Sequence, residues 1–74
     1  MSQLPGEIDG RRFLRAMARL GWHVATVRGS HFTLVSAVNP RKVRVAFHAT
    51  LSRHSVKRAL EEAEVTLEEF LEAY

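Results

Sequence analysis

The first regular pattern along the chain is a set of apolar side chains at helical spacing. Phe13, Met17 and Leu20 recur at i, i+4 and i+7, which places them along one face of a helix. Asp9 precedes this stripe and can accept a hydrogen bond from a free backbone N–H as the N-cap residue. Gly21 follows the stripe and suits the position just after a helix end. The pattern predicts a first helix between Asp9 and Gly21.

Three segments with strand-like composition come next. Residues 22–27 are rich in aromatic and β-branched side chains but do not alternate cleanly, whereas residues 31–36 and 42–47 alternate apolar and polar positions. Short turns are predicted at residues 28–30, which contain a glycine, and at residues 39–41, which contain Asn-Pro. The apolar side chains that the last two strands direct to one face are Phe32, Leu34, Val43, Val45 and Phe47. Trp22 begins the first strand and is expected to pack at the edge of the core rather than to stack on a base.

The opposite face of these two strands has a different character. If the apolar side chains pack against helices, the other face of the sheet is basic and carries histidine. Its predicted members are His31, Thr33, Lys42, Arg44 and His48.

Two helices are predicted after the strands. Ser52 can cap the first of them, and its apolar positions at helical spacing are Val56, Ala59, Leu60 and Ala63. Thr66 and Glu69 form a capping box sequence, since each side chain can bond the other residue's backbone N–H, and a short helix follows from Leu67 to about Ala73.

The predicted fold is an α+β domain of two layers that spans residues 1–74. Its element order is α-β-β-β-α with an appended short helix, and the helices cover one face of a three-stranded antiparallel sheet. Double-stranded-RNA-binding domains have the same element order. That analogy favours RNA as a ligand without deciding the function, because one fold serves many functions.

Composition narrows the classes of function. The chain has 74 residues and no cysteine, so disulfides, thiolate metal sites and cysteine nucleophiles are excluded. No apolar run approaches the length of about 20 residues that a membrane-spanning helix needs, and the first residues lack the pattern of a secretory signal. We expect a cytoplasmic protein that does not associate with membranes.

The charge is unevenly distributed. Residues 1–58 hold all eleven Lys and Arg and only two acidic residues, which gives this part a formal charge of +9, whereas residues 59–74 hold six Glu and have a charge of −6. A basic body of this kind attracts polyanions, and nucleic acid is the commonest of these. The alternative is a basic surface that serves only solubility. Four arginines on the predicted first helix, at positions 11, 12, 15 and 19, are consistent either with a solvated face or with a track for phosphates.

Several motifs together resemble the HicA family of toxin mRNA interferases, also called YcfA-like proteins. The first helix ends in Leu20-Gly21-Trp22, and the first hairpin reads Arg28-Gly29-Ser30-His31, where the family has a glycine-serine-histidine signature. His48 corresponds to a histidine at the end of a family strand. The second helix, Ser55-Val56-Lys57-Arg58-Ala59-Leu60, and the ending Leu67-Glu68-Glu69-Phe70-Leu71 complete the resemblance. It covers nearly the whole chain.

Three stretches depart from the family pattern. Members commonly have a proline shortly before the histidine that corresponds to His48, a glycine near the start of the second helix, and alanine-glycine-leucine before the last helix. Here the last of these stretches reads Ala63-Glu64-Val65. These departures concern loop geometry more than the core or the hairpin.

The resemblance implies an endoribonuclease that a HicB-type antitoxin protein keeps inactive, with His31 as the catalytic group. We expect it to cut RNA without a metal or cofactor. The residues are compatible with this chemistry. RNA cleavage without a metal requires one proton to be removed from the ribose 2′-OH and another to be supplied to the leaving 5′-oxygen, and imidazole can do either near neutral pH. One histidine cannot be acid and base at the same instant. Water or His48 is therefore expected to take the other role.

The predicted RNA-binding residues surround this histidine or follow on the second helix: Arg28, Gly29, Ser30, Lys42, Arg44, Lys57 and Arg58. Gly29 would let the backbone approach a phosphate, and the cations would stabilise developing charge. His23 and His54 lack a motif around them and are expected on the surface. The histidine spacing gives no helical i, i+4 pair, so no metal site is predicted.

Two other functions remain open at this point. A non-catalytic RNA-binding module could use the same basic face, in which case His31 is an ordinary exposed residue of a hairpin. A structural subunit whose charge serves assembly is the third alternative. Both the enzyme and the binding module predict RNA affinity that falls with salt, so only cleavage separates them.

Overall fold

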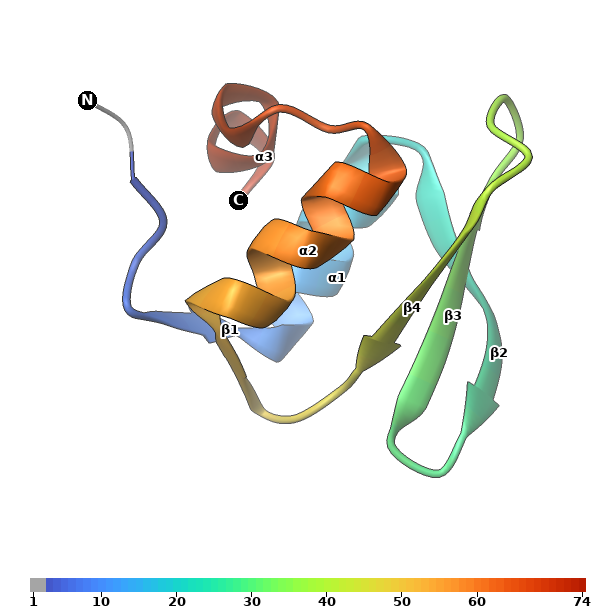
Figure 1. Ribbon diagram of the computed structural model, residues 1–74, viewed down its shortest axis with the longest axis horizontal. Helices are drawn as coiled ribbons and strands as arrows, with labels where there is room; N and C mark the ends of the chain where they lie inside the picture. Colours follow the sequence, from blue (N-terminus) through green and yellow to red (C-terminus); the bar gives the residue numbers. More distant parts are fainter. Residues whose placement is uncertain (1–2) are drawn as a thin grey trace.

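Helices and an antiparallel sheet form two layers in the computed structural model, which describes residues 3–74 (Figure 1). In chain order the elements are β1 (Glu7–Asp9), α1 (Gly10–Arg19), β2 (Trp22–Arg28), β3 (His31–Ser36), β4 (Lys42–Ala46), β5 (Thr50–Ser52), α2 (Arg53–Ala63) and α3 (Leu67–Ala73). The main sheet has the strand order β2-β3-β4. The predicted α+β class, with a helix, three antiparallel strands, a helix and an appended helix, is confirmed. No helix in the described part of the chain is long and apolar enough to span a membrane.

The short strands β1 and β5 were not predicted. They pair antiparallel to each other, with Ile8 opposite Leu51, and both of these side chains are buried. β1 leads directly into α1 and β5 leads directly into α2, so this two-stranded ribbon joins the starts of the two main helices. Strands of three residues are too short to produce a detectable alternation.

Helix α1 has the ends that its sequence predicts. The Asp9 carboxylate accepts a hydrogen bond of 2.9 Å from the backbone N–H of Arg12, which satisfies one of the free donors at the helix start. Gly21 follows the helix with a φ of +93°, a left-handed value that glycine adopts without strain. Phe13, Ala16 and Met17 lie on the buried face.

Helices α2 and α3 are capped as predicted. The Ser52 hydroxyl accepts a hydrogen bond from the N–H of Ser55, and Thr66 and Glu69 form both bonds of the capping box. The backbone and hydroxyl of Thr66 hydrogen-bond the Glu69 carboxylate and hold the pKa of Glu69 below its ordinary value. Glu64 ends α2 with a φ of 58°. This is a left-handed conformation, and the residue that adopts it at a helix end is usually glycine.

The core lies between the helices and one face of the sheet. α1 packs against β2, and α2 packs against β4. The buried side chains that the main sheet contributes are Trp22, Leu34, Val43 and Val45. Trp22 is 3% exposed, so it is a packing residue, as predicted. The aromatic rings of Phe13 and Phe70 join α1 to α3, with 5.8 Å between their centroids.

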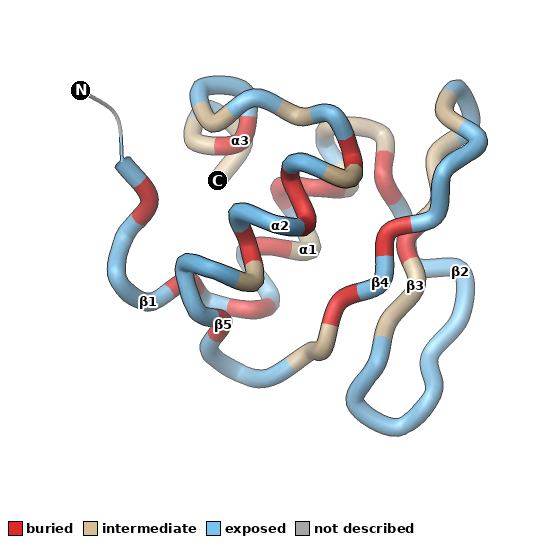
Figure 2. The backbone as a smooth tube through the Cα atoms, viewed as in Figure 1, coloured by how far each residue is buried: buried red, intermediate tan, exposed pale blue. Residues whose placement is uncertain are grey.

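The β2–β3 hairpin extends beyond the helical layer (Figures 1 and 2). All residues of β2 after Trp22 are exposed, including Val24 and Val27. The pairing of β2 with β3 shifts between Val24 and Thr26, which is where a β-bulge changes the face to which each side chain points. This bulge explains why residues 22–27 lack a clean alternation.

Candidate functional site

His31 begins β3 directly after the tight turn of the β2–β3 hairpin. Arg28 pairs with His31 across this turn, so Gly29 and Ser30 form a two-residue loop. Gly29 has a φ of +58°, and a glycine with positive φ at the first loop position is typical of a type II′ hairpin turn. His31 is exposed. The tight turn therefore places an accessible imidazole at the end of the hairpin.

The strand register gathers several polar side chains on the face of the sheet that points away from the helices. His31 lies opposite Ala46, Thr33 opposite Arg44, and Val35 opposite Lys42. Residues that pair directly across antiparallel strands point to the same face. The predicted grouping of His31, Thr33, Lys42 and Arg44 on one face is therefore what the register of β3 and β4 produces.

A solvent-open groove of about 510 Å³ lies beside His31, and we call it the His31 groove. Its lining residues are His31, Lys42, Arg44, Ala46, Arg58 and Glu62. His31 belongs to β3, whereas Arg58 and Glu62 belong to α2, which packs against the outer strand β4. The β4 residues consequently lie between one wall formed by the histidine and another formed by the helix.

The charges of the His31 groove suit a polyanion. Lys42, Arg44 and Arg58 supply three cations against the single carboxylate of Glu62. Lys42, Arg44 and Ala46, which are alternate residues of β4, all line the groove. From the rise per residue of a strand, the distance from Lys42 to Ala46 along β4 is about 13 Å. Arginine and lysine side chains can bind phosphates, and a nearby imidazole can transfer a proton to or from a bound group.

The turn of the hairpin is supported by Phe47, the residue that follows β4. The carbonyl oxygen of Ser30 accepts a hydrogen bond from the N–H of Phe47, and the Phe47 ring stacks on Phe32 with 4.6 Å between centroids and 15° between planes. Arg28, Gly29 and Ser30 are exposed at the tip, beside the His31 groove but not in its lining. Their side chains and backbone are accessible to a ligand that extends past His31.

His48 is not brought into the His31 groove. β4 ends at Ala46, so the alternation that would place His48 on the same face as His31 stops before it. The chain approaches the start of α1 here: the N–H of Gly10 donates to the carbonyl oxygen of Ala49, and the carbonyl oxygen of His48 occupies the space that a Cβ on Gly10 would need. The His48 side chain is exposed, and its role as a second proton-transfer group stays a prediction.

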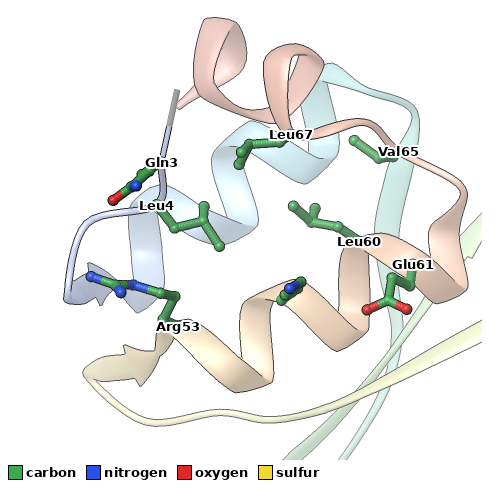
Figure 3. A pocket seen from close by; sticks show the side chains of 8 residues that line it. Gln3, Leu4, Arg53, Leu60, Glu61, Val65 and Leu67 are labelled. Atoms are coloured by element: carbon green, nitrogen blue, oxygen red, sulfur yellow. The ribbon is translucent and has the colours of Figure 1, made fainter. Parts of the chain in front are cut away.

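Lys57 lies on another side of α2 from its neighbour Arg58. It lines a second groove of about 400 Å³. Leu4, Leu60, Val65 and Leu67 give this groove apolar walls, with the charged side chains of Arg53 and Glu61 at its edge (Figure 3). Of the two adjacent cations predicted to bind RNA, only Arg58 therefore lines the groove with His31.

Glu62 was not singled out from the sequence, although one local signal points to it. It follows Arg58 by four residues, and side chains at i and i+4 of a helix occupy the same face. Once Arg58 is assigned to an RNA-binding surface, Glu62 is expected beside it. What the sequence does not indicate is that this face of α2 lies next to His31 across β4.

The remaining histidines and arginines have other surroundings. His23 and His54 are exposed, as expected. Among residues 3–74, no group of three or more histidine, aspartate or glutamate side chains is placed to hold a metal ion. Two of the four arginines of α1 bind the end of α3: Arg12 donates to the carbonyl oxygen of Tyr74 and Arg19 to that of Ala73. These two arginines hold helices together.

Comparison with known sequences assigns most of this chain to one family. A family model described as "HicA toxin of bacterial toxin-antitoxin" matches residues 10–65, a range that includes the hairpin and all residues of the His31 groove. No curated protein and no solved structure matches the chain.

Proposed function

Because the chain belongs to the HicA toxin family of bacterial toxin–antitoxin systems, we propose that it is a metal-independent endoribonuclease that cleaves mRNA with His31 as general acid–base. Its substrate is RNA, and its regulator is an antitoxin protein of the HicB type.

The placement of His31 is the observation that carries the proposal. The imidazole is exposed at the end of a supported hairpin, and it lines a groove with Lys42, Arg44 and Arg58. A general acid or base must reach the reacting atoms, and the groups that hold a phosphate must lie beside it. A buried imidazole or a groove without cations would not support a ribonuclease.

The reaction needs only proton transfer and charge stabilisation. The ribose 2′-oxygen loses its proton and attacks the adjacent phosphorus, the bond from phosphorus to the 5′-oxygen breaks, and the 5′-oxygen gains a proton. The products are a 2′,3′-cyclic phosphate and a 5′-hydroxyl end. His31 supplies one of the two proton transfers, which contributes roughly 10² to 10⁴-fold in rate. Lys42, Arg44 and Arg58 stabilise the charge that develops on the phosphate oxygens.

The proposed partner is an antitoxin protein that covers the same groove. A toxin–antitoxin family implies an antitoxin partner, and a HicB-like protein would inhibit this toxin by covering the His31 groove. Since three cations line the groove against one carboxylate, we expect the antitoxin to present acidic side chains there. The protein would act in the cytoplasm, where mRNA is available.

The test is cleavage of a structured RNA by the purified protein in EDTA, with His31→Ala as the critical variant. The wild type is expected to cleave and to leave cyclic phosphate ends, and His31→Ala is expected to lose roughly 10² to 10⁴-fold of the rate. His54→Ala is the matched control, because His54 is an exposed histidine that lies outside the groove. Urea unfolding of each variant checks that the fold is retained.

The outcomes separate the enzyme from the binding module. Cleavage that persists in His31→Ala would remove His31 from the mechanism. RNA binding without any cleavage by the wild type would favour the non-catalytic module. In cells, growth arrest on expression of the toxin alone, relieved by a neighbouring antitoxin gene, checks the biological role.

A further inference from the structure

Phosphate binding does not explain the carboxylate of Glu62, the one acidic side chain that lines the His31 groove. The other charged side chains that line the His31 groove are all cations: Lys42, Arg44 and Arg58. Glu62 is also the only one of the eight acidic residues that is not exposed. A carboxylate held here repels the phosphate that the cations attract, so binding alone does not account for it.

We propose that Glu62 is the general base of the cleavage reaction and that His31 is the general acid. This inference rests on the proposed ribonuclease function and assigns the second proton transfer that one histidine cannot perform. It makes Glu62 a catalytic residue that contacts the ribose 2′-OH of the bound RNA.

His31 and Glu62 lie on different walls of the His31 groove. The attacking 2′-oxygen and the leaving 5′-oxygen lie on opposite sides of the phosphorus in an in-line displacement, so a base and an acid must approach from opposite sides. His31 comes from β3 and Glu62 from α2, with β4 between them. His48 is absent from this lining.

The cations complete the arrangement. Arg58 precedes Glu62 by one helical turn on the same face of α2, and Lys42 and Arg44 lie on the strand between the two walls. They are the other charged groups that line the groove with Glu62, and they would hold the phosphate between the two walls. A general base must be ionised to accept a proton, whereas His31 must be protonated to donate one.

The proton balance closes in one step. The Glu62 carboxylate takes the proton of the 2′-OH while the 2′-oxygen bonds to phosphorus. The bond to the 5′-oxygen breaks, and the His31 imidazolium gives its proton to that oxygen. Exchange with water then returns Glu62 to the carboxylate and His31 to the imidazolium.

Glu62→Gln is the decisive variant, measured by single-turnover cleavage and by RNA affinity under the same salt. We expect the cleavage rate to fall roughly 10² to 10⁴-fold, while RNA affinity stays the same or rises because a negative charge is removed. The acidic limb of the pH–rate profile, which reports protonation of the base, should disappear. Glu62→Asp keeps a carboxylate and should retain that limb at a reduced rate.

Glu61→Gln is the matched control. Glu61 is the preceding residue of α2 and lines the other groove, so the same charge change there should leave the rate and the pH profile unaltered. If Glu62→Gln keeps the full rate, or cleaves faster as its affinity rises, Glu62 is not the base. Loss of cleavage in His31→Ala together with full activity in Glu62→Gln would overturn only this inference. A wild type that does not cleave would overturn the ribonuclease and the role of Glu62 together.

Discussion

The guanidinium of Arg12 lies over the ring of Tyr74, with 3.9 Å from its central carbon to the ring centroid. The same guanidinium donates a hydrogen bond of 2.8 Å to the carbonyl oxygen of Tyr74. The Tyr74 hydroxyl accepts a hydrogen bond of 3.0 Å from the backbone N–H of Asp9, and its ring stacks on Phe70. These contacts attach the end of α3 to the start of α1, across the full length of the chain.

Removal of the Arg12 side chain should weaken this attachment. Arg12→Ala loses the contact of the cation with the ring and one hydrogen bond, so we expect the free energy of unfolding to fall by about 1–2 kcal/mol. The exposed neighbour Arg11 is the matched control, and Arg11→Ala should change stability by less than about 0.5 kcal/mol. Urea denaturation measures both. Equal losses in the two variants would show that net charge, not the contact with Tyr74, is responsible.

Gly10 is required by a close contact rather than by its conformation. A Cβ on Gly10 would overlap the carbonyl oxygen of His48 and lie 2.9 Å from a ring carbon of Phe47. The N–H of Gly10 also donates to the carbonyl oxygen of Ala49. We expect Gly10→Ala to lower the free energy of unfolding by about 1–3 kcal/mol, because the β4–β5 connection must move to admit the methyl group.

Gly6 provides the comparison for this variant. A Cβ there would find its nearest neighbour, the end of the Arg53 side chain, at 3.8 Å, which is an ordinary contact. Gly6→Ala should therefore be nearly neutral or slightly stabilising. A neutral Gly10→Ala in the same denaturation experiment would mean that the connection is free to shift.

Glu64 adopts a left-handed conformation that costs a non-glycine residue about 1 kcal/mol. The family pattern has glycine in this stretch, so Glu64→Gly should relieve the strain. It would also remove the hydrogen bond that the Glu64 carboxylate accepts from the Asn39 amide. Glu64→Ala removes the same bond but keeps the strain. We expect the glycine variant to be more stable than the alanine variant by about 1 kcal/mol in thermal or urea unfolding.

The two adjacent cations of α2 should differ in their effect on RNA. Arg58 lines the His31 groove and Lys57 does not. Arg58→Ala should weaken RNA binding and lower the slope of log K against log salt by about 0.7 for a single-stranded RNA. Lys57→Ala should change both much less. Fluorescence anisotropy over a series of salt concentrations measures this, and equal effects would extend the proposed RNA-binding surface to both sides of α2.

Local features of the sequence were sufficient to predict most elements and their ends. The caps at Asp9, Ser52 and Thr66 bond to residues only three positions away, so the residue types and their spacing already contain the contact. The apolar stripe of α1 and the alternation of β3 and β4 likewise identify their buried faces. The motif around Gly29 and His31 pointed to the family that the comparison confirms.

The features that were missed depend on contacts between distant segments. β1 and β5 are separated by about forty residues, and their pairing joins the starts of α1 and α2. His48 appeared to share a face with His31 because alternation was extended past the actual end of β4. Glu62 lies beside the His31 groove because α2 packs on β4. Residue spacing within either element does not reveal this packing.

For this protein the sequence alone determined the order of helices and strands, the basic body and the histidine at a tight turn, because each depends on interactions within a few residues. Only the tertiary structure decided which charges share a groove with that histidine. The placement of Arg58 and Glu62 beside His31, and of Lys57 away from it, depends on how α2 is oriented against the edge of the sheet. That orientation is set by the burial of side chains from all parts of the core together, so it cannot be predicted from any one segment.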